Sequence, residues 1–172
     1  GARVEHVVRS NGSAVGVEAS VNGHRRRFGA GSVVLAAGGI GSAQILRASG
    51  IERAGRDVFF DPLVVMQGEV DGLRGGREFP MAAGVHLEQD GCMLADLSWP
   101  RWVYQLFAAE VGRVDRLLAH RRTLPIMVKV RDELGGRLTE RGGVRKRLSG
   151  VDRERLRAGS EHARRIVARA GS

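Results

Sequence analysis

The 172-residue sequence has little of what several protein classes depend on. Its single cysteine, Cys92, excludes an internal disulfide and a zinc site built from cysteines. No stretch is apolar enough to cross a membrane. The alternating, charged N-terminus is not a signal peptide. We therefore expect a protein without a membrane span, located in the cytoplasm, whose lone thiol belongs to the core.

The sequence also lacks the usual catalytic and metal-binding patterns. Its five histidines are scattered, and no two stand at the spacing that places both imidazoles on one helix face. The segment around Ser42 does not have the Gly-x-Ser-x-Gly spacing of a nucleophile elbow. The glycine-rich segment 135–143 has no Gly-Lys-Ser/Thr ending, and its alternating flanks favour a hairpin over a phosphate loop. We predict no catalytic residue and no metal ligand.

The net charge is +9, and its distribution weakens the case for a nucleic-acid partner. Residues 1–112 hold 11 basic and 12 acidic side chains, whereas residues 113–172 hold 17 and 7. Only Lys129 and Lys146 are lysines, and an excess of arginine over lysine is typical of GC-rich genomes. The basic third has few aromatic residues for base stacking. We do not expect nucleic acid as a partner, although a small basic α+β module that binds nucleic acid or an acidic partner stays open as the alternative.

The first 28 residues predict a three-stranded antiparallel meander. Alternating runs cover residues 3–8, 14–21 and 24–28. Asn22-Gly23 separates the last two, and this dipeptide is the strongest short hairpin signal because both residues tolerate positive φ. A fully apolar strand, 33–37, is then expected to be covered on both faces, as in a parallel sheet.

After this strand we expect alternating helices and strands. Ser42 is predicted to cap a short helix that Gly50 ends. We predict strands within 63–72, a loop over 73–80 and two strands over 81–97 around Asp90-Gly91. A helix with one apolar stripe is predicted over 102–120, followed by a sheet with tight turns over 126–148. The last predicted element is a helix from Asp152 to about Gly171, with a buried stripe of Leu156, Ala163, Ile166, Val167 and Ala170. The length allows one domain or two incomplete lobes.

The stretch 36–39, Ala-Ala-Gly-Gly, carries the clearest functional signal. It follows an apolar strand, and its small residues let a ligand or another backbone approach closely. Ligands bind at the carboxyl ends of strands in open α/β sheets. Ligand binding and simple close packing both explain the pattern.

The same region resembles a signature of the glucose–methanol–choline (GMC) flavoprotein oxidoreductases. In that signature a Gly-Ala pair leads to Ser-Pro, two aliphatic residues and Ser-Gly-Ile-Gly. The chain keeps Gly38, Ser42, Ile45, Leu46, Ser49, Gly50 and Ile51 in register. It departs from the signature at Gly39, Ala43 and Glu52, and Phe60-Asp61-Pro62 stands where the family has Asp-His-Pro. The segments before and after the signature are similar to the family's meander and to its substrate-domain strands and helix.

The resemblance implies an α/β protein, α+β within this chain, that binds FAD and oxidises the CH–OH group of a small-molecule alcohol by hydride transfer to the flavin. Residues 1–60 would be the C-terminal part of a Rossmann-like FAD-binding domain, and 61–172 part of a substrate domain with an antiparallel sheet. Val4 and Ala36 would border the adenine through their backbone. Ala37 and Gly38 would allow close approach, and Ser42 would cap the helix beside the cofactor.

The resemblance also implies that the chain is a middle segment. The family's Gly-x-Gly-x-x-Gly turn for the FAD pyrophosphate and its C-terminal catalytic histidine have no counterpart in this sequence, which begins with Gly1. We therefore expect the chain to be inactive alone and to have the remaining segments of the same enzyme as partners. A separately encoded subunit that assembles with such segments is a further interpretation.

Overall fold

The computed structural model of the chain describes residues 1–171 and divides them into two compact units. Unit 1 comprises residues 1–59 and 134–147, and unit 2 comprises residues 60–133 together with the chain from 148 onward. Helices and antiparallel sheets occur together, which confirms the predicted α+β class. Each unit is described separately below.

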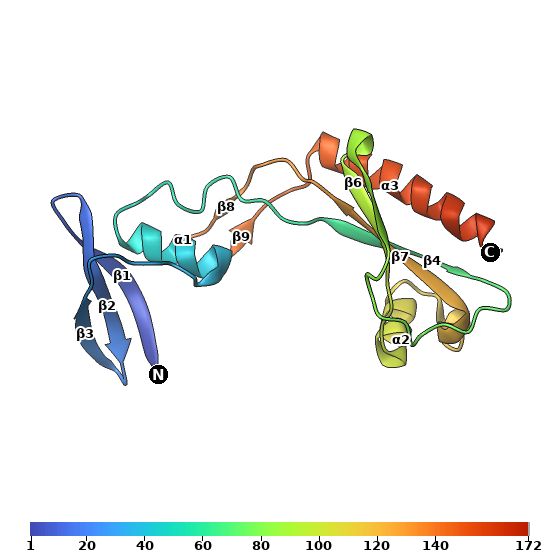
Figure 1. The fold of residues 1–172 in the computed structure, drawn as a ribbon, viewed down its shortest axis with the longest axis horizontal. Helices are drawn as coiled ribbons and strands as arrows, with labels where there is room; N and C mark the ends of the chain where they lie inside the picture. The colour runs from blue at the N-terminus through green and yellow to red at the C-terminus, as the bar shows by residue number, and fades with distance from the viewer. Residues whose placement is uncertain (172) are drawn as a thin grey trace. The chain divides into compact units, whose positions relative to one another are not determined.

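The N-terminal meander of unit 1 forms as predicted (Figure 1). Its strands are β1 (Ala2–Ser10), β2 (Ser13–Val21) and β3 (His24–Gly29). Both connections are Asn-Gly pairs: Asn11 and Asn22 have φ of 49° and 51°, and the glycines that follow them have 81° and 83°. Two successive positive φ values suit the right-handed twist of a hairpin, which is why these dipeptides set the register.

The predicted strand at 33–37 is wrong. These residues form no strand, and Val34 is 89% exposed rather than covered on both faces. An extended segment becomes a strand only when a neighbour satisfies its backbone groups, and no described segment pairs with it. The following helix is α1 (Gly38–Ala48), and it begins four residues before the predicted cap at Ser42.

The hairpin of β8 (Arg137–Leu138) and β9 (Val144–Arg145) completes unit 1. The predicted hairpin at the glycine-rich segment is thus confirmed. Gly136 has a φ of 76°, and a side chain there would overlap the Arg145 carbonyl. Leu138 is buried and lies next to Gly55, whose added Cβ would come within 2.8 Å of the Leu138 Cβ. The hairpin therefore packs against the segment that follows α1.

Unit 2 is built on a four-stranded antiparallel sheet in the order β4-β7-β6-β5. The strands are β4 (Leu63–Glu69), β5 (Gly84–Leu87), β6 (Cys92–Asp96) and β7 (Thr123–Val130), and a 3-10 turn, η1 (Glu88–Asp90), joins β5 to β6. This confirms the predicted strands within 63–72 and 81–97. The buried side chains between the sheet and the C-terminal helix are Cys92, Leu94, Ile126, Val128, Val130, Ala163 and Val167.

The helix predicted over 102–120 is shorter than expected. Helix α2 (Arg101–Glu110) ends where Gly112 adopts a φ of 74°, and the 3-10 turns η2 (Val114–Arg116) and η3 (His120–Arg122) follow. Its buried residues are Tyr104 and Ala108, whereas Leu106 is 59% exposed. The Tyr104 hydroxyl donates to the Arg116 carbonyl at 2.8 Å and holds the chain back against the helix.

The C-terminal helix α3 (Gly150–Arg169) lies alongside the sheet (Figure 1). Its N-cap is Ser149, not Asp152 as predicted, and the two side chains form a capping box. Asp152 is 1% exposed and also accepts a hydrogen bond from the Glu133 backbone amide at 2.8 Å. The predicted stripe is right at Ala163 and Val167, but Ile166 is 42% exposed and Ala170 is also exposed.

The compact units differ from the predicted domains in two places. Phe60 belongs to unit 2 rather than to the first domain, and residues 134–147 pack with unit 1, although we predicted them within the domain 61–172. The division is one of packing, so the assignment of domain functions stays a prediction. Within residues 1–171, no helix combines the length and apolarity that crossing a membrane requires.

Candidate functional site

Helix α1 is fixed to the meander by one serine. The Ser49 hydroxyl donates to the Ile45 carbonyl at 2.6 Å and accepts a hydrogen bond from the Val7 amide at 2.8 Å. The first bond closes the last turn of α1, and the second joins that turn to β1. The helix and the strand thereby form the two walls of a hollow within unit 1.

The turn into α1 is organised by Ser42, but in a different way from the prediction. Ala37 is the N-cap residue, and it makes no side-chain cap hydrogen bond. Ser42 lies inside the helix, and its hydroxyl accepts a hydrogen bond from the Ala37 amide at 3.2 Å. The predicted N-cap role is therefore wrong. The serine holds the peptide that precedes the helix, because a hydroxyl at this position reaches back over the first turn.

A cavity of about 800 Å³ lies between β1 and α1. The residues that line it come from β1, from α1 with its N-cap, and from the β8–β9 loop: Ala2, Arg3, Val4, Glu5, Ala37, Gly41, Gln44, Ile45, Arg47, Ala48, Thr139 and Glu140. The lining combines small and aliphatic residues with the polar Gln44 and Thr139 and with four charged residues, Arg3, Glu5, Arg47 and Glu140. Such a lining suits a flat, largely apolar group with polar edges.

The structure brings two of the five predicted site residues together in this cavity, namely Val4 and Ala37. Ala36 and Gly38 flank Ala37, and Ser42 is hydrogen-bonded to the Ala37 amide from within α1, but none of the three lines the cavity. Gly38 has a φ of 72°, which few residues other than glycine tolerate, and an added Cβ would have no atom within 4 Å. The backbone at Gly38 is therefore open to close approach by another molecule.

Sequence reasoning missed the lining residues Thr139 and Glu140. They lie about ninety positions after α1, and only the packing of Leu138 against Gly55 brings them to the site. It also missed Arg47, whose guanidinium donates to the Leu138 carbonyl at 3.1 Å. The sequence Arg137-Leu138-Thr139 has no pattern that could have indicated that this segment packs against α1.

The histidines take no part in the cavity as the described residues form it. His162 contacts Asp90 at 2.8 Å, and His120 contacts the Trp99 carbonyl at 2.8 Å, both within unit 2. The cavity can bind and orient a ligand. Its lining offers Glu5 and Glu140 as titratable carboxylates.

The lining can be tested against the adenine end of FAD. Adenine is planar, and Val4, Ala37 and Ile45 would offer aliphatic contacts to its faces if it occupied the cavity. Backbone amides and carbonyls near Gly38 can approach its edges, since no side chain is in the way. These residues supply shape and hydrogen-bonding edges, while the redox chemistry belongs to the cofactor.

Comparison with known proteins identifies the first part of the chain. Residues 1–66 match the family model of the GMC oxidoreductases, and this range includes β1, the turn at Ala37 and all of α1. No match to a curated protein was found. The N-terminal domain of this family binds FAD. The match supports a GMC oxidoreductase segment at residues 1–66, in a family of FAD-binding flavoproteins.

Proposed function

We propose that this chain supplies the adenine side of an FAD site in an enzyme that oxidises the CH–OH group of a small-molecule alcohol. The observation that carries the proposal is the cavity between β1 and α1, which lies largely within the residues that match the family. When bound, FAD supplies the acceptor for the hydride that leaves the alcohol carbon.

Each predicted site residue has a proposed role in holding the adenine. Val4 borders it through its backbone and Ala37 leaves room for it within the cavity. Ala36 and Gly38, which flank Ala37 without lining the cavity, keep the approach to it free of large side chains. Ser42 does not touch the ligand but fixes the Ala37 peptide through its hydroxyl. A turn held in one conformation before binding loses less entropy when the ligand arrives.

We propose that residues 61–172 belong mainly to the substrate domain, with the remaining segments of the same enzyme as partners. The sheet of unit 2 with α3 on one face supports this assignment. The candidate contacts of this chain are confined to one end of FAD. We therefore expect the chain alone to bind FAD weakly and to turn over no alcohol.

The binding step is tested with adenosine, which carries the adenine but no phosphate. In ¹⁵N-labelled protein, adenosine should shift the amide resonances of Val4, Ala37 and Gly38 and leave those of unit 2 in place. Ala37→Leu fills the cavity and should abolish the shifts. Ala30→Leu adds the same side chain at an exposed position of unit 1 outside the lining and should leave them unchanged.

Shifts that occur only in unit 2, or that persist in Ala37→Leu, would show that the cavity is not the adenine site.

The oxidation reaction is tested on this chain co-expressed with the segments that complete the enzyme. Anaerobic addition of a primary or secondary alcohol should bleach the flavin absorbance, and the matching tertiary alcohol, which has no hydrogen on its carbinol carbon, should not.

A further inference from the structure

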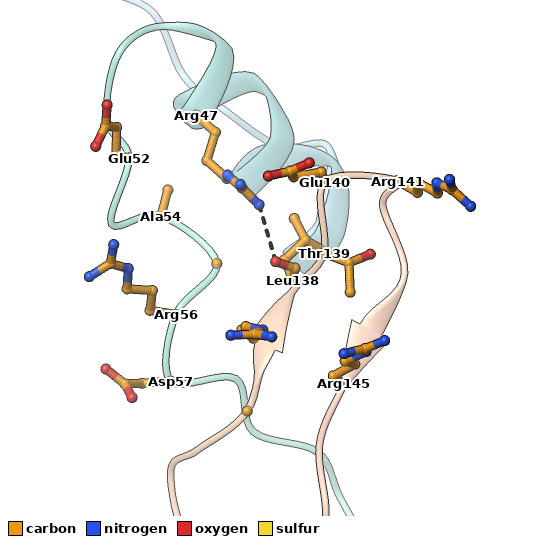
Figure 2. A pocket seen from close by; sticks show the side chains of 13 residues that line it. Arg47, Glu52, Ala54, Arg56, Asp57, Leu138, Thr139, Glu140, Arg141 and Arg145 are labelled. Carbon is orange, nitrogen blue, oxygen red and sulfur yellow. Dashed lines mark hydrogen bonds between the residues drawn. The ribbon is translucent and has the colours of Figure 1, made fainter.

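A second cavity of unit 1, of about 830 Å³, is dominated by arginine (Figure 2). It is lined by parts of α1, the segment 52–57 and the β8–β9 hairpin. The charged residues in its lining are Arg47, Arg56, Arg137, Arg141, Arg145, Glu52, Asp57 and Glu140. Five guanidinium groups against three carboxylates leave an excess of two positive charges around one hollow.

Three of these arginines stand directly opposite one another, and we call them the arginine row. Arg137 pairs with Arg145 across the β8–β9 hairpin, and Arg56 pairs with Arg137 on the other side. Residues that face each other across antiparallel segments project to the same side. Figure 2 shows Arg56 and Arg145 on the segments that flank β8.

The backbone hydrogen bonds around Arg56 and Arg137 define the type of pair that these residues form. The Leu138 amide donates to the Gly55 carbonyl at 2.7 Å, and the Asp57 amide donates to the Gly136 carbonyl at 3.2 Å. These bonds flank the pair, so Arg56 and Arg137 form the non-hydrogen-bonded type of pair, in which side chains lie nearer to each other. Like charges in this position repel and destabilise the sheet.

No carboxylate forms an ion pair with the arginine row within residues 1–171. None of the three arginines of the row has an Asp or Glu oxygen within 4 Å, although Asp57 is next to Arg56 in the chain. By contrast, Arg25 of the meander pairs with Glu18 at 3.0 Å. The row thus keeps its hydrogen-bond donors available for a ligand.

The net charge of the chain is unevenly divided between the two units. Unit 1 holds 13 Lys and Arg against 5 Asp and Glu, whereas unit 2 holds 15 against 14. The part of the basic last third that belongs to unit 2 is balanced, because the acidic residues of 60–112 lie in the same unit as α3. Nearly all of the excess charge therefore lies in the unit that contains the arginine row.

We propose that the arginine row binds a phosphate group. A guanidinium group presents a planar pair of N–H donors that matches the oxygens of a phosphate. The excess of two positive charges in the lining equals the charge of a phosphate dianion. The β8–β9 loop is formed in advance, since the Thr139 hydroxyl accepts a hydrogen bond from the Gly143 amide at 3.0 Å.

The test is a titration with inorganic phosphate at constant ionic strength, followed by isothermal calorimetry. Arg137→Gln removes the centre of the row and should weaken phosphate binding by about tenfold or more, as expected for hydrogen bonds to a charged group. Arg26→Gln makes the same charge change on β3, where Arg26 faces Ala19, and should leave the affinity unchanged.

A second readout separates ligand binding from a structural role. Without phosphate, Arg137→Gln should unfold at a temperature equal to or above that of the wild type, because the substitution relieves repulsion. A variant that lost both phosphate binding and thermal stability would contradict the proposal. Equal weakening by Arg137→Gln and Arg26→Gln would also contradict it, since diffuse charge would then explain the binding.

Two further ligands decide where the phosphate comes from. Displacement of phosphate by FAD but not by riboflavin would show that the row serves the phosphates of the cofactor. Unchanged phosphate binding in the presence of FAD would show a site for a separate phosphorylated molecule. If duplex DNA bound with a steep salt dependence while inorganic phosphate did not bind, the row would be a nucleic-acid surface and the proposal would be overturned. Adenosine has no phosphate, so these results are independent of the adenine test.

Discussion

Ser49 connects the helix wall and the strand wall of the candidate adenine cavity with a single hydroxyl. It satisfies the Val7 amide of β1 and a carbonyl of α1 at the same time. A backbone amide that loses its partner in a partly buried position costs more than the bond itself contributes. The geometry of the cavity therefore depends on a residue that does not line it.

We expect Ser49→Ala to destabilise unit 1 by about 1–2 kcal/mol, because the Val7 amide is left without an acceptor. Hydrogen exchange at Val7 should accelerate, and adenosine should bind more weakly. Ser32→Ala removes an exposed hydroxyl that has no hydrogen-bond partner among residues 1–171 and should change neither quantity. Unchanged exchange at Val7 in Ser49→Ala would contradict this account.

Asp115 shows the effect of neighbouring guanidinium groups in unit 2. Hydrogen bonds from Arg113, at 3.0 Å to each carboxylate oxygen, and one from Arg116 lower the pKa of Asp115 to about 2. A carboxyl group whose pKa is lowered by folding stabilises the folded state above its ordinary pKa, near 4, and loses that contribution as the pH falls toward 2.

An NMR titration of the Asp115 carboxyl should therefore give a pKa near 2. Arg113→Gln should raise it toward the ordinary value, because Arg113 is the largest cause of the shift. Arg121→Gln, at an exposed position that makes no side-chain contact with Asp115, is the control and should leave the pKa in place. A low pKa that persisted in Arg113→Gln would contradict the assigned cause.

At the scale of elements, α3 can approach the sheet of unit 2 because Gly159 has no side chain. Gly159 is buried, and a Cβ there would overlap Val128 and come within 3.3 Å of the Cys92 sulfur. Glycine lowers the propensity of a helix interior by about 1 kcal/mol relative to alanine. The close approach of helix and sheet offsets that cost.

Gly159→Ala should lower the free energy of unfolding of unit 2 by about 1–3 kcal/mol, since overpacking outweighs the gain in helix propensity. Chemical denaturation followed by tryptophan fluorescence measures the change. Gly150→Ala is the matched control, because a Cβ at Gly150 meets no atom within 4 Å. Stabilisation by Gly159→Ala would show that the helix can move away from the sheet at little cost.

The sequence predicted elements well where local chemistry decides them. Asn22-Gly23 specified its hairpin because two positive φ values are needed there. Prediction from the sequence failed where contacts between distant segments determine the secondary structure. The apolar segment 33–37 has strand propensity but no pairing partner in the described chain, and the continuous pattern from Trp102 to His120 hides the break at Gly112. The capping box at Ser149 and Asp152 could be predicted only in part, because serine and aspartate are both favourable N-cap residues and the sequence does not show which of them begins the helix.

The candidate site was predictable to a similar extent. Val4 and Ala37 followed from the resemblance of the meander and of the Ala-Ala-Gly segment to the family, and both line one cavity. Thr139, Glu140 and the arginine row depend on the return of residues 134–147 to unit 1, which no local pattern indicates. Long-range packing of this kind is set by the whole chain, and a hairpin motif does not reveal what it will pack against.

At the scale of the molecule, the two units differ in how much apolar surface they bury. Among the described residues, the buried apolar side chains of unit 1 are Ala19 and Leu138, and all the others belong to unit 2. Burial of apolar surface is the main source of stability, so unit 1 is the weaker of the two. Both tryptophans, Trp99 and Trp102, lie in unit 2 and report on it alone.

We therefore expect two unfolding transitions in urea. Far-UV circular dichroism should show an early loss of strand signal that tryptophan fluorescence does not follow. Saturating phosphate should move only the early transition to higher urea, because a ligand stabilises the unit that binds it. Coincident transitions by both probes would instead indicate that the chain unfolds as one cooperative body.

The insertion of residues 60–133 between the two segments of unit 1 also determines the order in which these segments are synthesised. The meander and α1 leave the ribosome first, but Leu138, their partner at Gly55, follows only after residues 60–133. At about 5–20 residues per second, that interval lasts roughly 4–15 seconds. During this time the nascent N-terminal segment lacks one of its two buried apolar side chains and is open to proteases and chaperones, so a pause in translation before residue 134 should lower the yield of folded protein.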